Sequence, residues 1–215
     1  MSLQRDALVR NEPSQIRSRK RRQSILAAAT HLLEEIGFEA LTTSAIAAKA
    51  KIPVSSIYQY FANKEAVVGS ILLREMEAVR EAYDGVETAY FRKTDWRTFF
   101  DHLFSAVLDV STSERVLAEL TRAIHASQDL SKLRDEQRLV LAKQFSRFIA
   151  GYGCRWSRQR LLNLSLFIYD VYLAVHTHAA NQPRRHWKQI ERWRRMVMFS
   201  LLEEALGEER KGGGC

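Results

Sequence analysis

The stretch Thr42–Glu65, TTSAIAAKAKIPVSSIYQYFANKE, decides the fold of this 215-residue chain. Its pattern predicts a short helix, a tight turn, a second short helix and the beginning of a third helix. The second short helix, from about Pro53 to Tyr60, has almost no long apolar side chain on its outer face, where small hydroxyl groups, Gln59 and two tyrosines stand instead. A helix that is packed on one side and polar on the other can enter the major groove of DNA without a clash.

Apolar positions on both sides of this stretch repeat at the spacing of one helix face. They predict a helix before the stretch and a long amphipathic helix after it. These positions are Ile25, Leu26, Ala29, Leu32, Leu33 and Ile36 upstream, and Val67, Val68, Ile71, Leu72 and Val79 downstream. We expect Gly37 to end the first helix and Thr43 to cap the next. We also expect Pro53 in the first turn of the following helix, and Asn63 as the cap of the long one.

The pattern resembles the helix-turn-helix of the TetR family of bacterial one-component regulators. The matching residues are Thr43, Ile46, Ala47, Ala50, Ser56 to Phe61 and Asn63 to Glu65. Two positions depart from the family pattern. Lys51 stands where most members have glycine, and Ser55 stands where the family usually has glycine or another very small residue. Lys51 then has to take the left-handed backbone conformation of the turn, at a cost of about 1 kcal/mol.

The resemblance implies an all-α chain, with a three-helix DNA-binding domain followed by a larger helical domain that binds an effector and forms the dimer. We therefore expect a flexible N-terminal segment in residues 1–16 and the helix-turn-helix domain in residues 17–64. A connecting helix runs from about residue 64 to 83. The effector-binding and dimerisation domain covers residues 84–207, and residues 208–215 form a flexible tail.

The distribution of charge supports contact with DNA. The whole chain carries a formal charge of +8, and residues 17–64 hold eight basic against three acidic residues. Lysine and arginine near phosphates supply most of the non-specific affinity for DNA. We expect the run Arg17–Arg22 to precede the first helix as an arm that reaches the minor groove or a flanking phosphate. The alternative is a solvated basic face, which the neighbouring helix-turn-helix makes the weaker interpretation.

The resemblance also implies roles for individual residues on the DNA. Base edges are expected to meet Ser44, Val54, Ser55 and Gln59, whereas Thr43, Tyr58, Tyr60 and Lys64 fix the register through phosphates. The full set of candidate DNA-binding residues is Arg19, Arg21, Arg22, Thr43, Ser44, Pro53, Val54, Ser55, Ser56, Tyr58, Gln59, Tyr60 and Lys64.

After residue 80 the apolar pattern predicts five further helices, with a break at Gly151-Tyr152-Gly153. Aromatic side chains are frequent there, and such a stripe forms either plain core or the wall of a pocket. The family resemblance favours a pocket in which His176, Tyr169, Tyr172 and Thr121 orient a ligand against apolar walls. A lone histidine such as His176 is otherwise a hydrogen-bonded core residue. The candidate ligand-binding residues are Phe99, Leu103, Phe104, Leu120, Thr121, Ile124, Phe148, Tyr169, Tyr172 and His176.

The helix that contains residues 161–175 is apolar over more than one face, so it has to be buried on more than one side. We expect it to pack against its own domain and, together with the last helix, against a second copy of the chain. The candidate interface residues are Leu164, Ile168, Val171, Trp193, Val197 and Leu201. Residues 151–195 also hold nine basic against two acidic residues. A solvated helix face explains this cluster better than an anionic ligand or a second nucleic-acid contact.

Other classes of protein fit less well. His176 and His178 are two positions apart, on different sides of a helix, so they cannot share a metal. The Gly151–Gly153 segment lacks the third glycine and the preceding strand of a dinucleotide loop. We therefore expect no enzymatic activity, no metal and no cofactor; an enzyme on a helical scaffold and a helical adaptor remain the alternatives. The polar beginning of the chain, two dispersed cysteines and the lack of a long apolar run indicate a cytoplasmic protein.

The expected function is regulation of transcription by a homodimer. Repression is the expected mode, with activation as the alternative. A small apolar or amphipathic effector is expected to release the dimer from a palindromic operator on double-stranded DNA.

Overall fold

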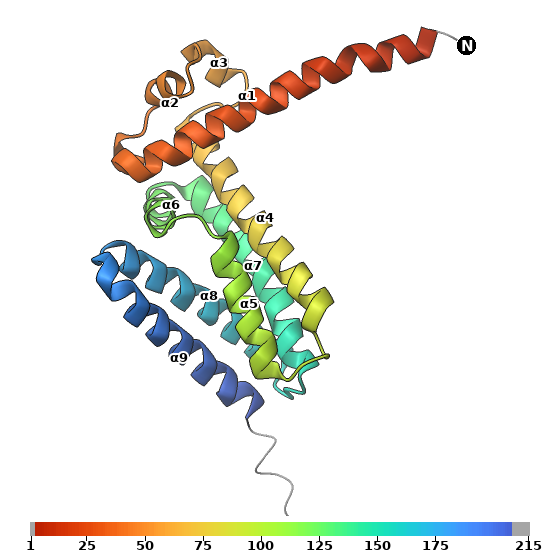
Figure 1. Ribbon diagram of the computed structural model, residues 1–215, viewed down its shortest axis with the longest axis vertical. Helices are drawn as coiled ribbons and strands as arrows, with labels where there is room; N and C mark the ends of the chain where they lie inside the picture. Colours follow the sequence, from red (N-terminus) through yellow and green to blue (C-terminus); the bar gives the residue numbers. More distant parts are fainter. Residues whose placement is uncertain (1–2, 208–215) are drawn as a thin grey trace, which may run out of the picture. The chain divides into compact units, whose positions relative to one another are not determined.

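The computed structural model describes residues 3–207, and the backbone alone for residues 3–16. All regular structure in this range is helical, which confirms the predicted fold class (Figure 1). The elements are α1 (Leu3–Ala40), α2 (Thr43–Lys49), α3 (Val54–Tyr58), α4 (Lys64–Tyr90), α5 (Trp96–Val110), α6 (Glu114–Ala126), α7 (Gln128–Gly151), α8 (Arg158–Ala180), the 3-10 helix η1 (Arg184–His186) and α9 (Trp187–Leu206). The predicted flexible tail, residues 208–215, lies outside the described residues.

The chain divides into two compact units, Met1–Ile71 and Leu72–Cys215. The boundary falls within α4, so this helix begins in the first unit and ends in the second. Among the described residues, no helix is long and apolar enough to cross a membrane.

The first unit is built around apolar side chains from four helices. Ile25 and Leu33 of α1, Ile46 of α2, Ile57 of α3 and Ile71 of α4 are all fully buried. Gly37 has φ 78° and ψ 173°, a conformation that side-chain-bearing residues rarely adopt, and it interrupts the helical backbone of α1. The predicted end of the first helix at Gly37 is thereby confirmed.

The basic run Arg17–Arg22 lies inside α1, so the prediction of an arm that precedes the first helix is wrong. The helical backbone also includes residues 3–16, where we expected a flexible segment. No glycine or proline stands between Arg17 and Ile36, and arginine, lysine, glutamine and alanine are good helix formers, so the helix continues through the basic run.

The helix ends of this unit follow local capping chemistry. Asn63 accepts a hydrogen bond from the Ala66 amide at 2.8 Å, which confirms the predicted cap of α4. The prediction that Thr43 caps α2 is wrong, because the neighbouring Thr42 accepts from the Ala45 amide at 3.0 Å. Pro53 is the N-cap of α3, one position before the helix begins. Lys51 has φ 55°, the left-handed conformation predicted for the turn.

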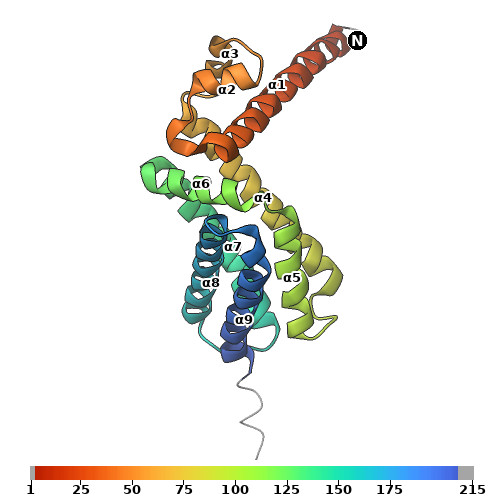
Figure 2. The ribbon, with the colours of Figure 1, turned by 60° about the vertical axis from the view of Figure 1, so that its left-hand side comes forward.

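The second unit has an aromatic core. Phe99 and Phe100 of α5 and Phe148 of α7 are fully buried, and Phe99 and Phe148 meet edge to face with ring centres 5.1 Å apart. Met198 of α9 is buried in the same core. Helices α8 and α9 run side by side in both views of the ribbon (Figure 2).

The predicted break at Gly151-Tyr152-Gly153 is present. Helix α7 ends at Gly151, and Gly153 has φ 99°. A Cβ atom on Gly151 would lie 2.3 Å from the ring of Phe91, so this position needs glycine for the close approach of α7 to the end of α4. Tyr152 closes the junction, since its hydroxyl accepts a hydrogen bond from the Arg92 amide at 3.1 Å.

Candidate DNA-binding surface and ligand cavity

The outer surface of α2 and α3 carries mostly small or polar side chains. Ser44, Ser55 and Gln59 are exposed, as is Pro53, and Val54 is 37% exposed. The packed sides of the same helices hold Ile46 and Ile57, which are completely buried. The residues expected to face base edges therefore share the solvent side of this unit, whereas Ser56 is partly buried.

A hydrogen bond between side chains joins α2 to α3. The hydroxyl groups of Thr43 and Tyr58 lie 3.2 Å apart, and Tyr58 is 57% exposed. Both residues are candidate phosphate ligands. One hydroxyl donates its only hydrogen to the other, and the accepting hydroxyl can donate its own hydrogen outward. The pair therefore leaves one hydroxyl donor for a phosphate and fixes its direction before any DNA arrives.

Two other candidate residues have partners within the first unit. Arg22 donates to the Ser70 hydroxyl at 3.3 Å, and its guanidinium carbon lies 5.6 Å from the centre of the Phe61 ring. Lys64 donates to the carbonyl oxygen of Phe38 at 3.1 Å. These contacts hold α1 against α4 at the beginning of the long helix.

A shallow concavity lies where α1 approaches the residues after α3. Arg17, Ser18, Arg21 and Tyr60 line it. Arginine side chains and a tyrosine hydroxyl around a hollow are suitable donors for a phosphate group. Arg19 is exposed on the same helix.

Helices α1 and α2 are also joined by an ion pair. The Lys49 ammonium donates to both carboxylate oxygens of Glu35, at 2.7 and 2.9 Å. The hydrogen bond from Lys49 holds the pKa of Glu35 below its ordinary value. Both side chains are exposed, so this pair orients α2 more than it stabilises the unit.

The second unit contains a cavity with a volume of about 70 Å³. Its walls come from five helices and from the residue that follows α5. The lining residues are Glu75, Met76, Val79 and Tyr83 of α4; Phe104 and Val107 of α5 with Ser111; Leu117 of α6; Leu141, Ala142 and Phe145 of α7; and Ser165, Ile168, Tyr169, Tyr172 and Leu173 of α8.

The structure distributes the ten candidate ligand residues over several places. Three of them line the cavity: Phe104, Tyr169 and Tyr172. Another three belong to the packed core: Phe99, Leu103 and Phe148. Leu120, Ile124 and His176 are buried away from the lining. The Thr121 hydroxyl donates to the carbonyl oxygen of Leu117 within α6.

The contribution of α4 to the cavity was missed, because this helix was expected only to connect the domains. Glu75, Met76, Val79 and Tyr83 follow the spacing of one helix face. They continue the face that begins with Val67 and Ile71, and this continuation was the signal that could have placed α4 in the cavity wall.

Ionisable groups in the cavity wall are affected by burial. Glu75 is only 8% exposed, and burial raises the pKa of its carboxyl although one oxygen accepts a hydrogen bond from the Thr112 amide at 3.1 Å. Burial also raises the pKa of Tyr169 and of Tyr172 to about 12, and raises that of Tyr83. The three tyrosines are therefore neutral hydroxyl groups at physiological pH.

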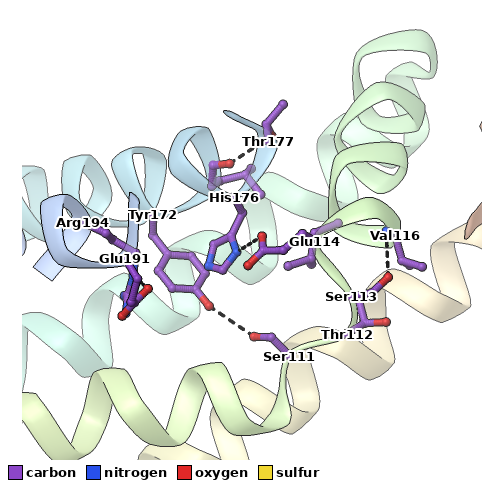
Figure 3. Close-up of polar contacts among 12 residues, drawn as sticks. Ser111, Thr112, Ser113, Glu114, Val116, Tyr172, His176, Thr177, Glu191 and Arg194 are labelled. Atoms are coloured by element: carbon purple, nitrogen blue, oxygen red, sulfur yellow. Dashed lines mark hydrogen bonds and ion pairs between the residues drawn. The ribbon is translucent and has the colours of Figure 1, made fainter. Parts of the chain in front are cut away.

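Tyr172 connects the cavity to a network of polar contacts (Figure 3). Its hydroxyl lies 3.2 Å from that of Ser111, in the segment between α5 and α6, and its ring packs on His176 at 4.1 Å between centres. His176, which is 3% exposed, forms a hydrogen bond through Nδ1 to the carboxylate of Glu114. Arg194 lies over the Tyr172 ring and donates to Glu191 at 2.8 Å. The network ties α8 to the beginning of α6.

The basic cluster of the last helix is mostly solvated. Arg184, Arg185, Lys188, Arg192 and Arg195 are exposed. Arg194 differs, because it is buried beneath Glu191 and the Tyr172 ring.

The candidate interface residues also separate into groups. Ile168 is 4% exposed and lies on the cavity wall, so it is not part of an outer face. Leu164, Val171 and Leu201 are half-buried, whereas Trp193 is 53% and Val197 39% exposed. Two large apolar side chains that we did not predict, Phe167 and Met196, are more than half exposed on the same two helices.

No cluster of three or more metal-ligating side chains occurs in the part of the chain that the structure describes.

Comparison with known proteins gives concordant matches. Residues 25–71 match the model of the tetR family of bacterial regulatory proteins. Over 187 residues the chain is 25% identical to the HTH-type transcriptional regulator HbdR of Aromatoleum sp. (strain CIB). The aligned stretch covers 86% of this chain and 75% of that protein.

Solved structures show the same fold. A TetR-family regulator from Mesorhizobium loti superposes with a TM-score of 0.65 at 21% identity, over 86% of this chain and 96% of the other. A transcriptional regulator from a Rhodococcus species gives a TM-score of 0.70 at 16% identity, over 86% of this chain and 97% of the other.

Proposed function

Because the chain belongs to the TetR family of bacterial regulators and is a helix-turn-helix regulator of transcription, we propose that it is a repressor that binds a palindromic operator as a homodimer. The observation that carries this proposal is the exposed polar face of α2 and α3 on a fully packed unit. A helix with such a face is the element that reads base edges in helix-turn-helix proteins.

The proposed base contacts are made by Ser44, Val54, Ser55 and Gln59, all exposed on this face. Gln59 is the strongest candidate for sequence readout, since its amide can both donate and accept and can pair with adenine. Thr43, Tyr58, Tyr60 and Lys64 contact phosphates in this proposal. Lys64 uses one of its three N–H groups on Phe38 and keeps the others for a phosphate.

The dimer is proposed to form through α8 and α9. Phe167, Trp193, Met196 and Val197 expose large apolar surfaces on these helices, and a second copy would remove that surface from water. Leu164, Val171 and Leu201 complete the face in this proposal. A two-fold dimer presents two identical reading helices, which matches an inverted-repeat operator.

An effector is proposed to bind in the cavity of the second unit and to release the operator. A ligand shifts a conformational equilibrium only through different affinities for the two states, and a coupling of about 1–3 kcal/mol is typical. The same helix α4 begins beside the reading unit at Lys64 and carries Glu75, Met76, Val79 and Tyr83 of the cavity wall. It is therefore the proposed lever.

The test is an electrophoretic mobility shift with the DNA next to the chain's own gene. We expect a dimer complex that Gln59→Ala weakens and that Gln128→Ala, at an exposed glutamine of the second unit, leaves unchanged. A thermal-shift screen then identifies ligands, which are retested for release of that DNA. Absence of any specific complex would contradict the repressor proposal, and ligands that stabilise the protein without affecting DNA would contradict induction.

A further inference from the structure

The cavity of the second unit has an unusual charge composition. Among its lining residues, Glu75 is the only one with an ionisable carboxyl, and none is lysine, arginine or histidine. A ligand with a carboxylate or phosphate would therefore meet one like charge and no fixed positive charge. The wall itself disfavours anions.

Glu75 has little compensation for its burial. It is 8% exposed and receives one hydrogen bond, from the Thr112 amide at 3.1 Å. A carboxylate can accept about four hydrogen bonds, and a buried one is costly unless it is paired. Burial accordingly raises the pKa of this carboxyl. The site gains most from a ligand that supplies a donor or a positive charge.

The arginines beside the cavity wall do not neutralise Glu75. Arg74, the preceding residue of α4, is exposed and lowers the pKa of that carboxyl less than burial raises it. Arg138 lies over the Tyr169 ring and pairs with Asp170, and Arg194 lies over the Tyr172 ring and pairs with Glu191. Neither lines the cavity. No ion pair formed within the described residues includes Glu75, whose partner is the Thr112 amide.

The remaining wall suits the apolar body of an organic cation. Five aromatic side chains line the cavity, and the electron-rich faces of aromatic rings attract ammonium groups. They are Tyr83, Phe104, Phe145, Tyr169 and Tyr172. The volume of about 70 Å³ is below the range of roughly 300–1,000 Å³ that is usual for drug-sized ligands, so the ligand is compact.

We propose that this cavity binds a compact organic ammonium ion, with an aromatic or alicyclic body against the aromatic wall and its N–H groups donating to Glu75. The inference rests on the proposed effector function of the same cavity and specifies its ligand class. A carboxylate of the same size is disfavoured, because it would meet the Glu75 carboxyl and no positive charge in the lining. A neutral alcohol binds more weakly than the ammonium ion because it lacks the charge.

The test compares three probes of similar size on the full-length protein at neutral pH: benzylamine, benzyl alcohol and benzoate. Binding is measured by calorimetry and by the shift of the unfolding temperature. We expect benzylamine to bind most tightly and benzoate most weakly. This ranking uses the wild-type chain alone, so it does not depend on how any variant folds. Benzoate binding as tightly as benzylamine, or no benzylamine binding at millimolar concentration, would overturn the proposal.

A matched pair of variants locates the charge. Glu75→Gln keeps an acceptor for the Thr112 amide and removes the charge, whereas Glu77→Gln removes a charge from the exposed side of the same helix. Loss of a charged hydrogen-bond partner should lower benzylamine affinity at least about tenfold in Glu75→Gln. Glu77→Gln should bind as the wild type does. Equal affinity in the two variants would refute the role of Glu75.

Operator release distinguishes this inference from the function on which it rests. Benzylamine that binds through Glu75 but leaves the DNA complex intact supports the ligand class and contradicts induction from this cavity. The opposite outcome is a neutral or anionic compound that releases DNA from the wild type but not from the cavity-filling variant Ala142→Leu. That result supports induction from this cavity and overturns the proposed ligand class.

Discussion

The Lys64 ammonium group donates a hydrogen bond to the carbonyl oxygen of Phe38 at 3.1 Å and lies 4.4 Å from the centre of the Phe38 ring. Phe38 directly follows the Gly37 break in α1, and Lys64 is the first residue of α4. One side chain therefore joins the end of the first helix to the beginning of the connecting helix. It is also a proposed phosphate ligand, so its two roles have to be separated by experiment.

We expect Lys64→Ala to weaken binding to all DNA sequences alike and to reduce the salt dependence of affinity by about one phosphate contact. The variant should also lose about 1–2 kcal/mol of unfolding free energy, because a hydrogen bond and a cation–π contact disappear. Affinity is measured over a series of salt concentrations, and stability by denaturant unfolding. A variant with altered sequence preference but an unchanged salt slope would contradict the phosphate role.

Two adjacent threonines provide the second prediction. Thr42→Ala should lower the unfolding free energy by about 1 kcal/mol, because the Thr42 hydroxyl caps α2 through the Ala45 amide. Thr43→Ala should cost less, since the Thr43 hydroxyl bonds the exposed Tyr58 hydroxyl instead. Chemical unfolding of the two variants measures the difference. Equal destabilisation would mean that the cap is shared between the two residues.

The features of the first unit that could be predicted from sequence depend on a few consecutive residues. Gly37 ends a helix because of its own backbone freedom, and Asn63 caps one through an amide three residues away. The choice between Thr42 and Thr43 could not be predicted in this way, because both residues suit a cap. The register of α2 decides it, and that register depends on the burial of Ile46 against other helices.

The cavity was less predictable, because the same aromatic residues can either pack together or line a void. Phe99 and Phe148 have rings 5.1 Å apart and fill the core, whereas Phe104 reaches the cavity wall. Ile168 belongs to an apolar pattern that fits both an interface and a core, and it is buried. Which side of α8 faces inward depends on how α7 and α9 pack against it, and the period of the sequence does not contain that information.

The buried carboxyl of Glu75 predicts a pH dependence of stability. Burial raises its pKa in the folded state above the ordinary value of 4.5. Folding therefore favours the protonated form of Glu75. The contribution of this protonated carboxyl to the free energy of unfolding is complete below the unfolded pKa and is lost as the pH rises through the folded pKa. Glu75→Gln removes the effect. Its stability relative to the wild type should increase as the pH rises above about 4.5.

Chemical unfolding at several pH values measures this difference, with Glu77→Gln as the control. Glu77 is exposed and pairs with Arg80, so its substitution should give little change with pH. A Glu75→Gln variant that becomes less stable than the wild type as the pH rises would show that the carboxylate is stabilised by its surroundings.

The last prediction concerns the proposed dimer. Trp193 and Val197 are 53% and 39% exposed, so aspartate at both positions meets water within one subunit and should change its unfolding free energy by no more than about 0.5 kcal/mol per site. Across an interface the same charges would be buried without partners. We expect the double variant to sediment as a monomer and to bind the operator more than about tenfold more weakly, because linked half-site binding is lost.

The control is Val140→Asp, which introduces the same chemistry at an exposed position of α7 outside the proposed face. It should remain a dimer with normal affinity for the operator. Ile168→Asp should behave differently from all of these variants, because Ile168 is 4% exposed on the cavity wall and a charge there disrupts the fold of the unit. If the Trp193→Asp, Val197→Asp chain remains dimeric, the subunits associate through another surface.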